Sequence, residues 1–262
     1  MHTPPLIKVL SSIVEKSSKN LVRDFRELKS MRGAKETANA FVNQSKAQAE
    51  SRIHELLHKT YPQANLFFKC AGLAQYSESP DMTWVINVLD GEENFKCGLP
   101  HFSMSFCLFE SGRLTASLVF DPLKNDLFWA YKGTGAFCGV HRMRVHAYRK
   151  NGPIVMIPGS KPDDLSRVNT LPFLHRVKIS WGSPALDFAY VACGYYDGLF
   201  FQDLVLCNDI YAGLFMIKES GGFASNRQGR FPTEKQDIII AGNNDCYNTL
   251  GRMIPDAFFD EK

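Results

Sequence analysis

The sequence predicts a mixed protein of the α+β or α/β class, in which a helical and antiparallel-sheet region precedes a region of alternating helices and strands. Three patterns favour this class. Near the N-terminus, apolar residues recur at helical spacing. Short apolar runs separated by glycine-containing turns follow, and after about residue 150 helical and strand patterns alternate. We therefore expect one domain, 1–262, with a helical and antiparallel lobe over 1–150 and an α/β lobe over 151–262.

Two long helices are predicted near the N-terminus. Apolar residues recur at helical spacing from about Pro5 to Leu28 and again from about Ala40 to Leu57. Tyr61-Pro62 should end the second helix, because a residue that precedes proline disfavours helical backbone. Each helix is expected to bury one apolar face.

The next segment is typical of an antiparallel meander. Thr83–Asp90 is a short apolar run that indicates a buried strand, and Phe102–Pro122 contains two strands around a turn at Ser111-Gly112. Asp126–Val140 continues the pattern and is punctuated by glycines. This region should form a sheet of sequential strands.

The last part of the chain alternates between strand and helix. Strands are predicted at Pro153–Pro158, Gly198–Phe201 and Asp237–Asn243, and helices at Pro184–Tyr196 and Asp209–Ser220. The second helix should end at Gly221-Gly222, since glycine favours the left-handed backbone of a helix C-terminus.

Composition limits the class of protein. A chain of 262 residues, 45% of them hydrophobic, is long enough to bury a core without disulfides or structural metal. A net charge of +3 is too small to indicate nucleic-acid binding by itself. The seven cysteines are scattered among apolar residues without a CxxC pair, which is typical of buried free thiols in a reducing compartment. With neither a signal peptide nor a membrane-spanning stretch apparent, we expect a cytoplasmic protein that does not bind membranes.

Three short segments are candidates for a functional site. Asp90-Gly91 follows a strand, where a carboxylate can bind a metal ion, although Asp-Gly more often forms a simple turn. Asp209 begins a helix, where it can cap the helix or bind a metal beside free amides. Gly182-Ser183 precedes another helix, where small residues let a polar ligand approach the backbone or merely cap the helix.

Taken together, these segments resemble one family. WVINVLDGEENF (Trp84–Phe95) stands where inositol monophosphatases have W-[IV]-[IV]-D-P-[IL]-D-G-T-x-N-F, and GSPALDFAYVACGYYDG, NDIYAG and ESGGF follow in the family's order. The resemblance covers nearly the whole chain and is closest to bacterial members of the SuhB type. It implies a layered αβαβα sandwich with an antiparallel sheet and a second, mixed sheet. It also implies a homodimer, for which the apolar meander around Phe102–Ala136 is a candidate contact unless it is simply core.

The resemblance further implies a magnesium-dependent phosphomonoesterase that acts on inositol or sugar phosphates. Clustered oxygen ligands hold Mg²⁺ in such sites, and the ions activate water and stabilise the leaving group. Asp90 and Asp209 match carboxylate ligands, and Leu89 matches a residue that contributes its backbone carbonyl. Asn87 replaces a ligand aspartate, so it retains an oxygen but loses the charge.

Other positions depart further from the family. The place of a ligand glutamate is taken by Lys69 or Cys70, and a lysine there would repel a cation. Of the two family residues that orient the attacking water, the threonine is Glu92 in this chain and the aspartate of the second helix is Lys46. Because both replacements fall where the family partners meet, we expect an ion pair between Lys46 and Glu92.

Of the positions that match the family's substrate-binding residues, some are retained and others are replaced. Gly182 and Ser183 match the turn that binds substrate through its backbone, and Asp209 lies beside it. A substrate-contacting acid is replaced by Phe201 or Gln202, and the tryptophan before the late aspartate is Asn208.

These replacements favour a phosphatase-fold protein whose catalysis is weak or lost and which acts by binding. SuhB-type relatives are associated with RNA polymerase and ribosomal RNA transcription, which makes the transcription machinery a possible partner. One alternative is an active phosphatase in which Glu92 and Glu93 supply new metal ligands, unless they are only solvated turn residues. Another is a protein that binds a phosphorylated sugar or nucleotide at Gly182-Ser183 and the Asp209 helix without hydrolysing it.

Overall fold

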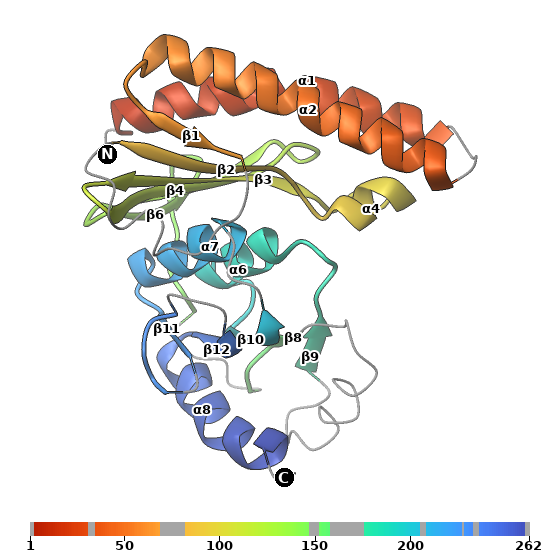
Figure 1. The fold of residues 1–262 in the computed structure, drawn as a ribbon. Helices are drawn as coiled ribbons and strands as arrows, with labels where there is room; N and C mark the ends of the chain where they lie inside the picture. Colours follow the sequence, from red (N-terminus) through yellow and green to blue (C-terminus); the bar gives the residue numbers. More distant parts are fainter. Residues whose placement is uncertain are drawn as a thin grey trace.

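The computed structural model describes residues 3–30, 35–68, 82–146, 152–157, 176–204, 208–226, 228–232 and 236–259. They form five layers in the order helix, sheet, helix, sheet, helix (Figure 1). This is the αβαβα sandwich that the sequence resemblance implied.

The first two layers are a helix pair and a seven-stranded sheet. Helices α1 (Pro5–Ser30) and α2 (Lys35–Thr60) cover the outer face of the sheet (Figure 1). Its strands follow one another in chain order, and every neighbouring pair is antiparallel except the parallel pair β1–β2. The strands are β1 (Asn65–Phe67), β2 (Thr83–Asp90), β3 (Ser103–Glu110), β4 (Arg113–Asp121), β5 (Asp126–Tyr131), β6 (Gly135–Cys138) and β7 (His141–Arg142).

Strands β2 and β3 are buried along almost their whole length, because helices cover both faces of the sheet. This explains why β2 is a continuous apolar run instead of an alternating one. The hairpin between β3 and β4 turns at Ser111 and Gly112, which both have positive φ values of 49° and 69°. Two left-handed residues match the right-handed twist of the flanking strands, and the predicted turn is confirmed.

The remaining layers complete the sandwich. Helices α6 (Pro184–Ala192) and α7 (Asn208–Glu219) lie between the two sheets, and α8 (Asn244–Phe259) covers the far side (Figure 1). The second sheet has the order β11-β12-β10-β8-β9 and is mixed, as expected, with antiparallel pairs at β11–β12–β10 and parallel pairs at β10–β8–β9. Its strands are β8 (Val155–Ile157), β9 (Val177–Ile179), β10 (Gly198–Leu204), β11 (Phe223–Asn226) and β12 (Gln236–Gly242). A short helix, α4 (Glu92–Cys97), follows β2.

Apolar clusters fill the spaces between layers. One cluster joins α1 and α2 to the first sheet, a second joins that sheet to α6, α7 and the second sheet, and a third lies under α8. Side chains of the Phe102–Ala136 meander belong to the first two clusters: Phe106 and Leu118 face the outer helices, whereas Cys107 and Val119 face α6 and α7. For these side chains the core alternative is therefore confirmed, because the protein's own helices bury them.

Two further sequence expectations concern single features. No helix in the described ranges combines the length and apolar character needed to cross a membrane. Cys97, Cys107, Cys138, Cys193 and Cys246 are free thiols, of which Cys97 is exposed, so the expectation of uniformly buried cysteines is wrong there.

Candidate functional site

The candidate site lies where β2 ends and the helices α6 and α7 begin. Asp90 is the last residue of β2, Ser183 precedes α6, and Asp209 lies in the first turn of α7. Strand β3 supplies the floor, because its antiparallel register places Ser103 opposite Asp90 and Ser105 opposite Asn87. The fold thus brings together three segments that the sequence singled out separately.

Asp90 is held by donors from two elements. Its carboxylate is 7% exposed, and its Oδ2 accepts hydrogen bonds from Ser183 Oγ at 2.6 Å and from the backbone N–H of Ala185 at 3.0 Å. A longer contact of 3.5 Å joins it to the hydroxyl of Ser103. Ser183 makes no side-chain cap on its own helix, so the capping interpretation is wrong for its hydroxyl, which binds Asp90 instead. Pro184 occupies the first helical turn as predicted.

Asp209 and Asn87 form a second hydrogen-bonded unit. The side-chain amide of Asn87 donates from Nδ2 to Asp209 Oδ2 at 2.8 Å, and the Ser105 hydroxyl donates to Oδ1 of the same carboxylate. The Oδ1 atom of Asn87 accepts a bond from the backbone N–H of Leu89 at 3.1 Å. Asn87 therefore presents a donor, not an oxygen, to Asp209.

Burial makes the carboxyl groups of Asp90 and Asp187 costly to ionise. Burial, followed by the negative charge of Asp209, raises the pKa of Asp90 well above its usual value of 3.8, although bonds from Ser183 and Ala185 partly offset this. Asp187 of α6 is also buried, and burial raises its pKa to about 7 despite a hydrogen bond from the Ser180 hydroxyl. Nothing in the local sequence indicated this behaviour of Asp187.

A group of charged residues lies at the junction of α2 and α4. Lys46 Nζ lies 2.7 Å from Glu92 Oε2, so the predicted ion pair is confirmed. The other oxygen of Glu92 contacts Lys96 Nζ at 2.8 Å, and Lys96 also pairs with Glu93 at 2.9 Å. Hydrogen bonds from Lys46 and then Lys96 lower the pKa of Glu92. Both glutamates lie in the first turn of helix α4 and pair with lysines, so they are not the solvated turn residues that the sequence offered as an alternative.

The turn at Gly182-Ser183 uses its polar groups internally. Gly182 has a φ of 82°, which favours glycine, and its N–H donates to Ser180 Oγ at 3.2 Å. The amides of Leu186 and Asp187 both donate to the carbonyl of Ser183 at 3.1 Å. These amides are therefore engaged with the protein.

Among the described residues, Asp90 and Asp209 supply the carboxylates at positions that match the family's metal ligands. Within the described ranges, no group of three or more His, Cys, Asp or Glu side chains is placed to hold a metal ion. Lys69 and Cys70, either of which replaces a ligand glutamate, lie outside those ranges. Mg²⁺ prefers several hard, negatively charged oxygen ligands, and Asn87 contributes no charge.

On the substrate side, Phe201 is buried in the central core and stacks on Phe188 with ring centroids 5.8 Å apart. Its side chain belongs to the packing and does not replace the function of an acid. The side chains of Gln202 and Asn208 are not among those that the structure describes.

A family model for the inositol monophosphatase family matches residues 4–255. The chain belongs to the inositol monophosphatase family. An inositol-1-monophosphatase of Rhizobium meliloti is 31% identical over 97% of this chain and 97% of its own length. The Nus factor SuhB of Escherichia coli K12 is 30% identical over 93% of this chain and 92% of its own. The crystal structure of the extragenic suppressor protein suhB from Bartonella henselae matches with a TM-score of 0.77, at 28% identity, over 97% of this chain and 99% of the other.

The inositol monophosphatase fold explains which predicted residues meet. It gathers Asn87, Asp90, Ser183 and Asp209 into one buried group and joins Lys46 to Glu92 beside it. Four participants were missed by sequence reasoning: Ser103, Ser105, Lys96 and Asp187. The two serines carried a signal, because polar residues spaced by two in an apolar strand point to the same face.

Proposed function

We propose that this inositol monophosphatase family member has lost most or all metal-dependent phosphomonoesterase activity and acts by binding. The Lys46–Glu92 ion pair, with 2.7 Å between its charged atoms, carries the proposal. These residues match the two family positions that orient the attacking water. A glutamate whose two oxygens each bind a lysine is a weak acceptor for a proton from water.

The state of Glu92 supports the same conclusion. Each of its oxygens contacts a lysine, at 2.7 Å for Lys46 and 2.8 Å for Lys96, and these contacts lower its pKa. A general base needs a pKa close to the working pH, so lowering the pKa makes Glu92 a weaker base.

The buried carboxylates also favour binding over catalysis. Asp90 accepts bonds from Ser183 and Ala185, while Asp209 accepts bonds from Asn87 and Ser105. A magnesium ion would have to replace some of these donors with only two of the family's charged ligands available. Loss of charged ligands commonly costs several kcal/mol in binding or in the barrier, about 3 kcal/mol for a single well-placed group.

An active site rearranged around Glu92 and Glu93 is less well supported. Moving Glu92 onto a metal would break its ion pair with Lys46 and leave Lys96 paired with Glu93 alone. Glu93 has a side chain that is 83% exposed and is paired with Lys96 at the surface. Phosphate capture at Gly182-Ser183 is also weakened, because several amides at that turn already bond within the protein.

The relatives suggest what the protein binds. Three curated relatives between 28% and 30% identical carry the name Nus factor SuhB. We propose the transcription machinery, as RNA polymerase or its factors, as the partner class, with a homodimer in the cytoplasm as the working form. Co-purification of the chain with RNA polymerase and Nus factors, compared with the Rhizobium meliloti relative, tests this candidate. Failure to bind any of these proteins under conditions where a Nus factor SuhB does bind argues against it.

The decisive test of lost catalysis is phosphate release from inositol 1-phosphate and sugar phosphates, with and without millimolar Mg²⁺. We expect the wild type to release no more phosphate than Asp90→Asn/Asp209→Asn. The triple variant Lys46→Asp/Glu92→Thr/Asn87→Asp restores three family residues and tests whether activity can be regained. The Rhizobium meliloti relative is the positive control. Magnesium-dependent turnover by the wild type that disappears in the double variant would refute the proposal.

A further inference from the structure

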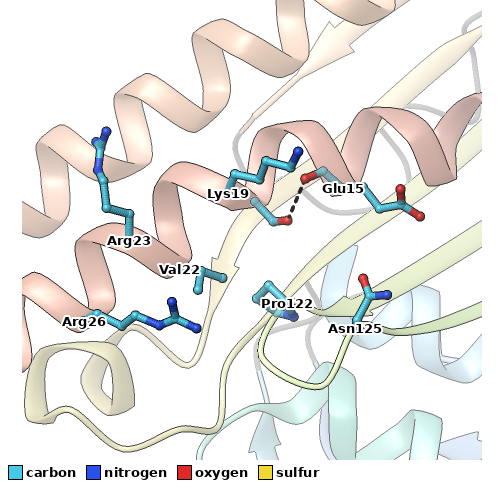
Figure 2. A pocket seen from close by; sticks show the side chains of 8 residues that line it. Glu15, Lys19, Val22, Arg23, Arg26, Pro122 and Asn125 are labelled. Atoms are coloured by element: carbon cyan, nitrogen blue, oxygen red, sulfur yellow. Dashed lines mark hydrogen bonds between the residues drawn. The ribbon is translucent and has the colours of Figure 1, made fainter.

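A basic cavity lies beside α1, and none of the residues that line it belongs to the family site. Its volume is about 550 Å³, and it lies between α1 and the turn that joins β4 to β5 (Figure 2). Protein sites for small ligands commonly have volumes of about 300–1,000 Å³, so the size suits a small molecule.

The charge of the cavity is strongly biased. Lys19, Arg23 and Arg26 line it against a single carboxylate, Glu15, so three positive charges and one negative leave a formal net charge of +2. Glu15 is already engaged, because its Oε1 accepts a hydrogen bond from Ser11 Oγ at 3.0 Å. Because the Asp24 carboxylate offsets Arg23, the uncompensated positive charge comes mainly from Lys19 and Arg26, and the lining favours an anion such as a phosphate monoester.

The three cations differ in whether they already form an ion pair with another residue. Arg23 bonds to Asp24 through Nε at 3.0 Å and Nη2 at 2.9 Å. Lys19 and Arg26 make no ion pair with any other residue in the described ranges. In Figure 2 the Arg26 side chain extends toward Pro122, whereas Arg23 points away from the turn. Lys19 and Arg26 are therefore the donors best placed to bind an anion.

The wall opposite α1 is the β4–β5 turn, which provides a polar side chain. Asn125 in the β4–β5 turn has a positive φ of 59° and an exposed side chain that lines the cavity. Its amide can donate to an oxygen held by Arg26, since guanidinium and amide groups both match phosphate oxygens. The apolar side chains of Val22 and Pro122 lie between these polar groups and can pack against the body of a ligand.

We propose that this cavity, formed by Lys19 and Arg26 of α1 and by Asn125 of the β4–β5 turn, binds a small phosphorylated molecule. It is a second anion site, independent of whether the Asp90–Asp209 site has any activity. The cavity is open to solvent, but its cations lie within about two turns of one helix, which favours a small ligand over an extended nucleic-acid strand that would follow a longer basic track.

The test is isothermal titration of the full-length protein with inorganic phosphate and with pyrophosphate at low ionic strength. We expect pyrophosphate to bind, and Lys19→Gln and Arg26→Gln each to weaken binding by about tenfold, as expected for the loss of a hydrogen bond between charged groups. Lys16→Gln is the matched control, because it removes the same charge from an exposed position on α1 that does not line the cavity.

Several outcomes would overturn the proposal. Absence of phosphate and pyrophosphate binding would do so, as would equal weakening by Lys16→Gln, which would indicate a general charge effect of the helix. Tight binding of a single-stranded RNA oligomer that pyrophosphate does not displace would also overturn it. Thermal unfolding of each variant shows that a lost signal is not a loss of folding, since Lys19 and Arg26 are both exposed.

Discussion

Lys46 of α2 and Glu92 of α4 are 46 residues apart in the sequence, yet their charged atoms lie 2.7 Å apart. The side chains are 30% and 32% exposed, so solvent screens the pair only in part. The pair ties the second helix to the short helix that follows the end of β2.

A double-mutant cycle with Lys46→Met and Glu92→Gln should give a coupling of about 0.5–1 kcal/mol in the free energy of unfolding. Glu92→Gln alone should cost more than Lys46→Met, because Glu92 also contacts Lys96 at 2.8 Å. Because the pKa of Glu92 is lowered, the coupling should be present at neutral pH and disappear as the pH falls below the usual Glu value of 4.5. The more exposed Arg52–Glu55 pair is the control and should show less coupling. Denaturant unfolding measures the wild type, the two single variants and the double variant. Zero coupling at neutral pH would contradict the role given to the ion pair.

Asp187 should make stability depend on pH. Burial raises its folded pKa from 3.8 to about 7, so the folded state holds this proton more tightly than the unfolded state does. The free energy of unfolding should therefore fall as the pH rises from about 4 to about 7. The fall is at most about 4 kcal/mol, because each pKa unit of difference between the folded and unfolded states corresponds to about 1.4 kcal/mol.

Asp187→Asn should flatten this part of the profile and make the protein more stable than the wild type above pH 7, because the amide carries no charge and can still accept the Ser180 bond. Chemical denaturation between pH 4 and pH 8 measures the effect. An unchanged profile in the variant would show that other buried groups, such as Asp90, dominate the dependence.

Asn87→Asp should create a repulsive pair of carboxylates. The present amide donates to Asp209 at 2.8 Å, and an aspartate would replace this bond with a like charge. We expect a loss of about 2 kcal/mol of stability at neutral pH without metal, and a rise in melting temperature when millimolar Mg²⁺ is added. Asn248→Asp, on the exposed side of α8, is the control for an added negative charge. A magnesium-dependent rise of similar size in the wild type would contradict the proposed weakening of its metal site.

Gly213 should be essential for the close packing of α7 on α6. A Cβ atom at this position would overlap Phe188, whose side chain is fully buried in the central core. Gly213→Ala should therefore destabilise the protein by about 1–3 kcal/mol. Gly251→Ala in α8 is the matched control, because no atom lies within 4 Å of its added Cβ, and it should be neutral or stabilising by up to about 1 kcal/mol. Thermal unfolding compares the two, and equal melting temperatures would disprove the packing argument.

The order of the main elements could be predicted from sequence because local patterns determine it. The apolar run of β2 has the predicted bounds, Thr83–Asp90, and Gly112 signals the hairpin because glycine readily adopts positive φ. Helix α4 was missed, since six residues after a glycine give too short a pattern. Helix α8 was also missed, and Gly251 and Pro255 weaken its local helical pattern.

The sequence by itself determined which chemical groups are available at the site. It showed that Asn87 lacks a charge, that Lys46 and Glu92 replace a family pair, and that Asp90 and Asp209 remain. Only the tertiary structure decided how these groups are used. Register and helix packing bring serine hydroxyls to the two aspartates and a second lysine to Glu92. The physical reason is that hydrogen-bond and ion-pair partners come from distant segments, whose meeting depends on the whole fold and leaves little trace in the local sequence.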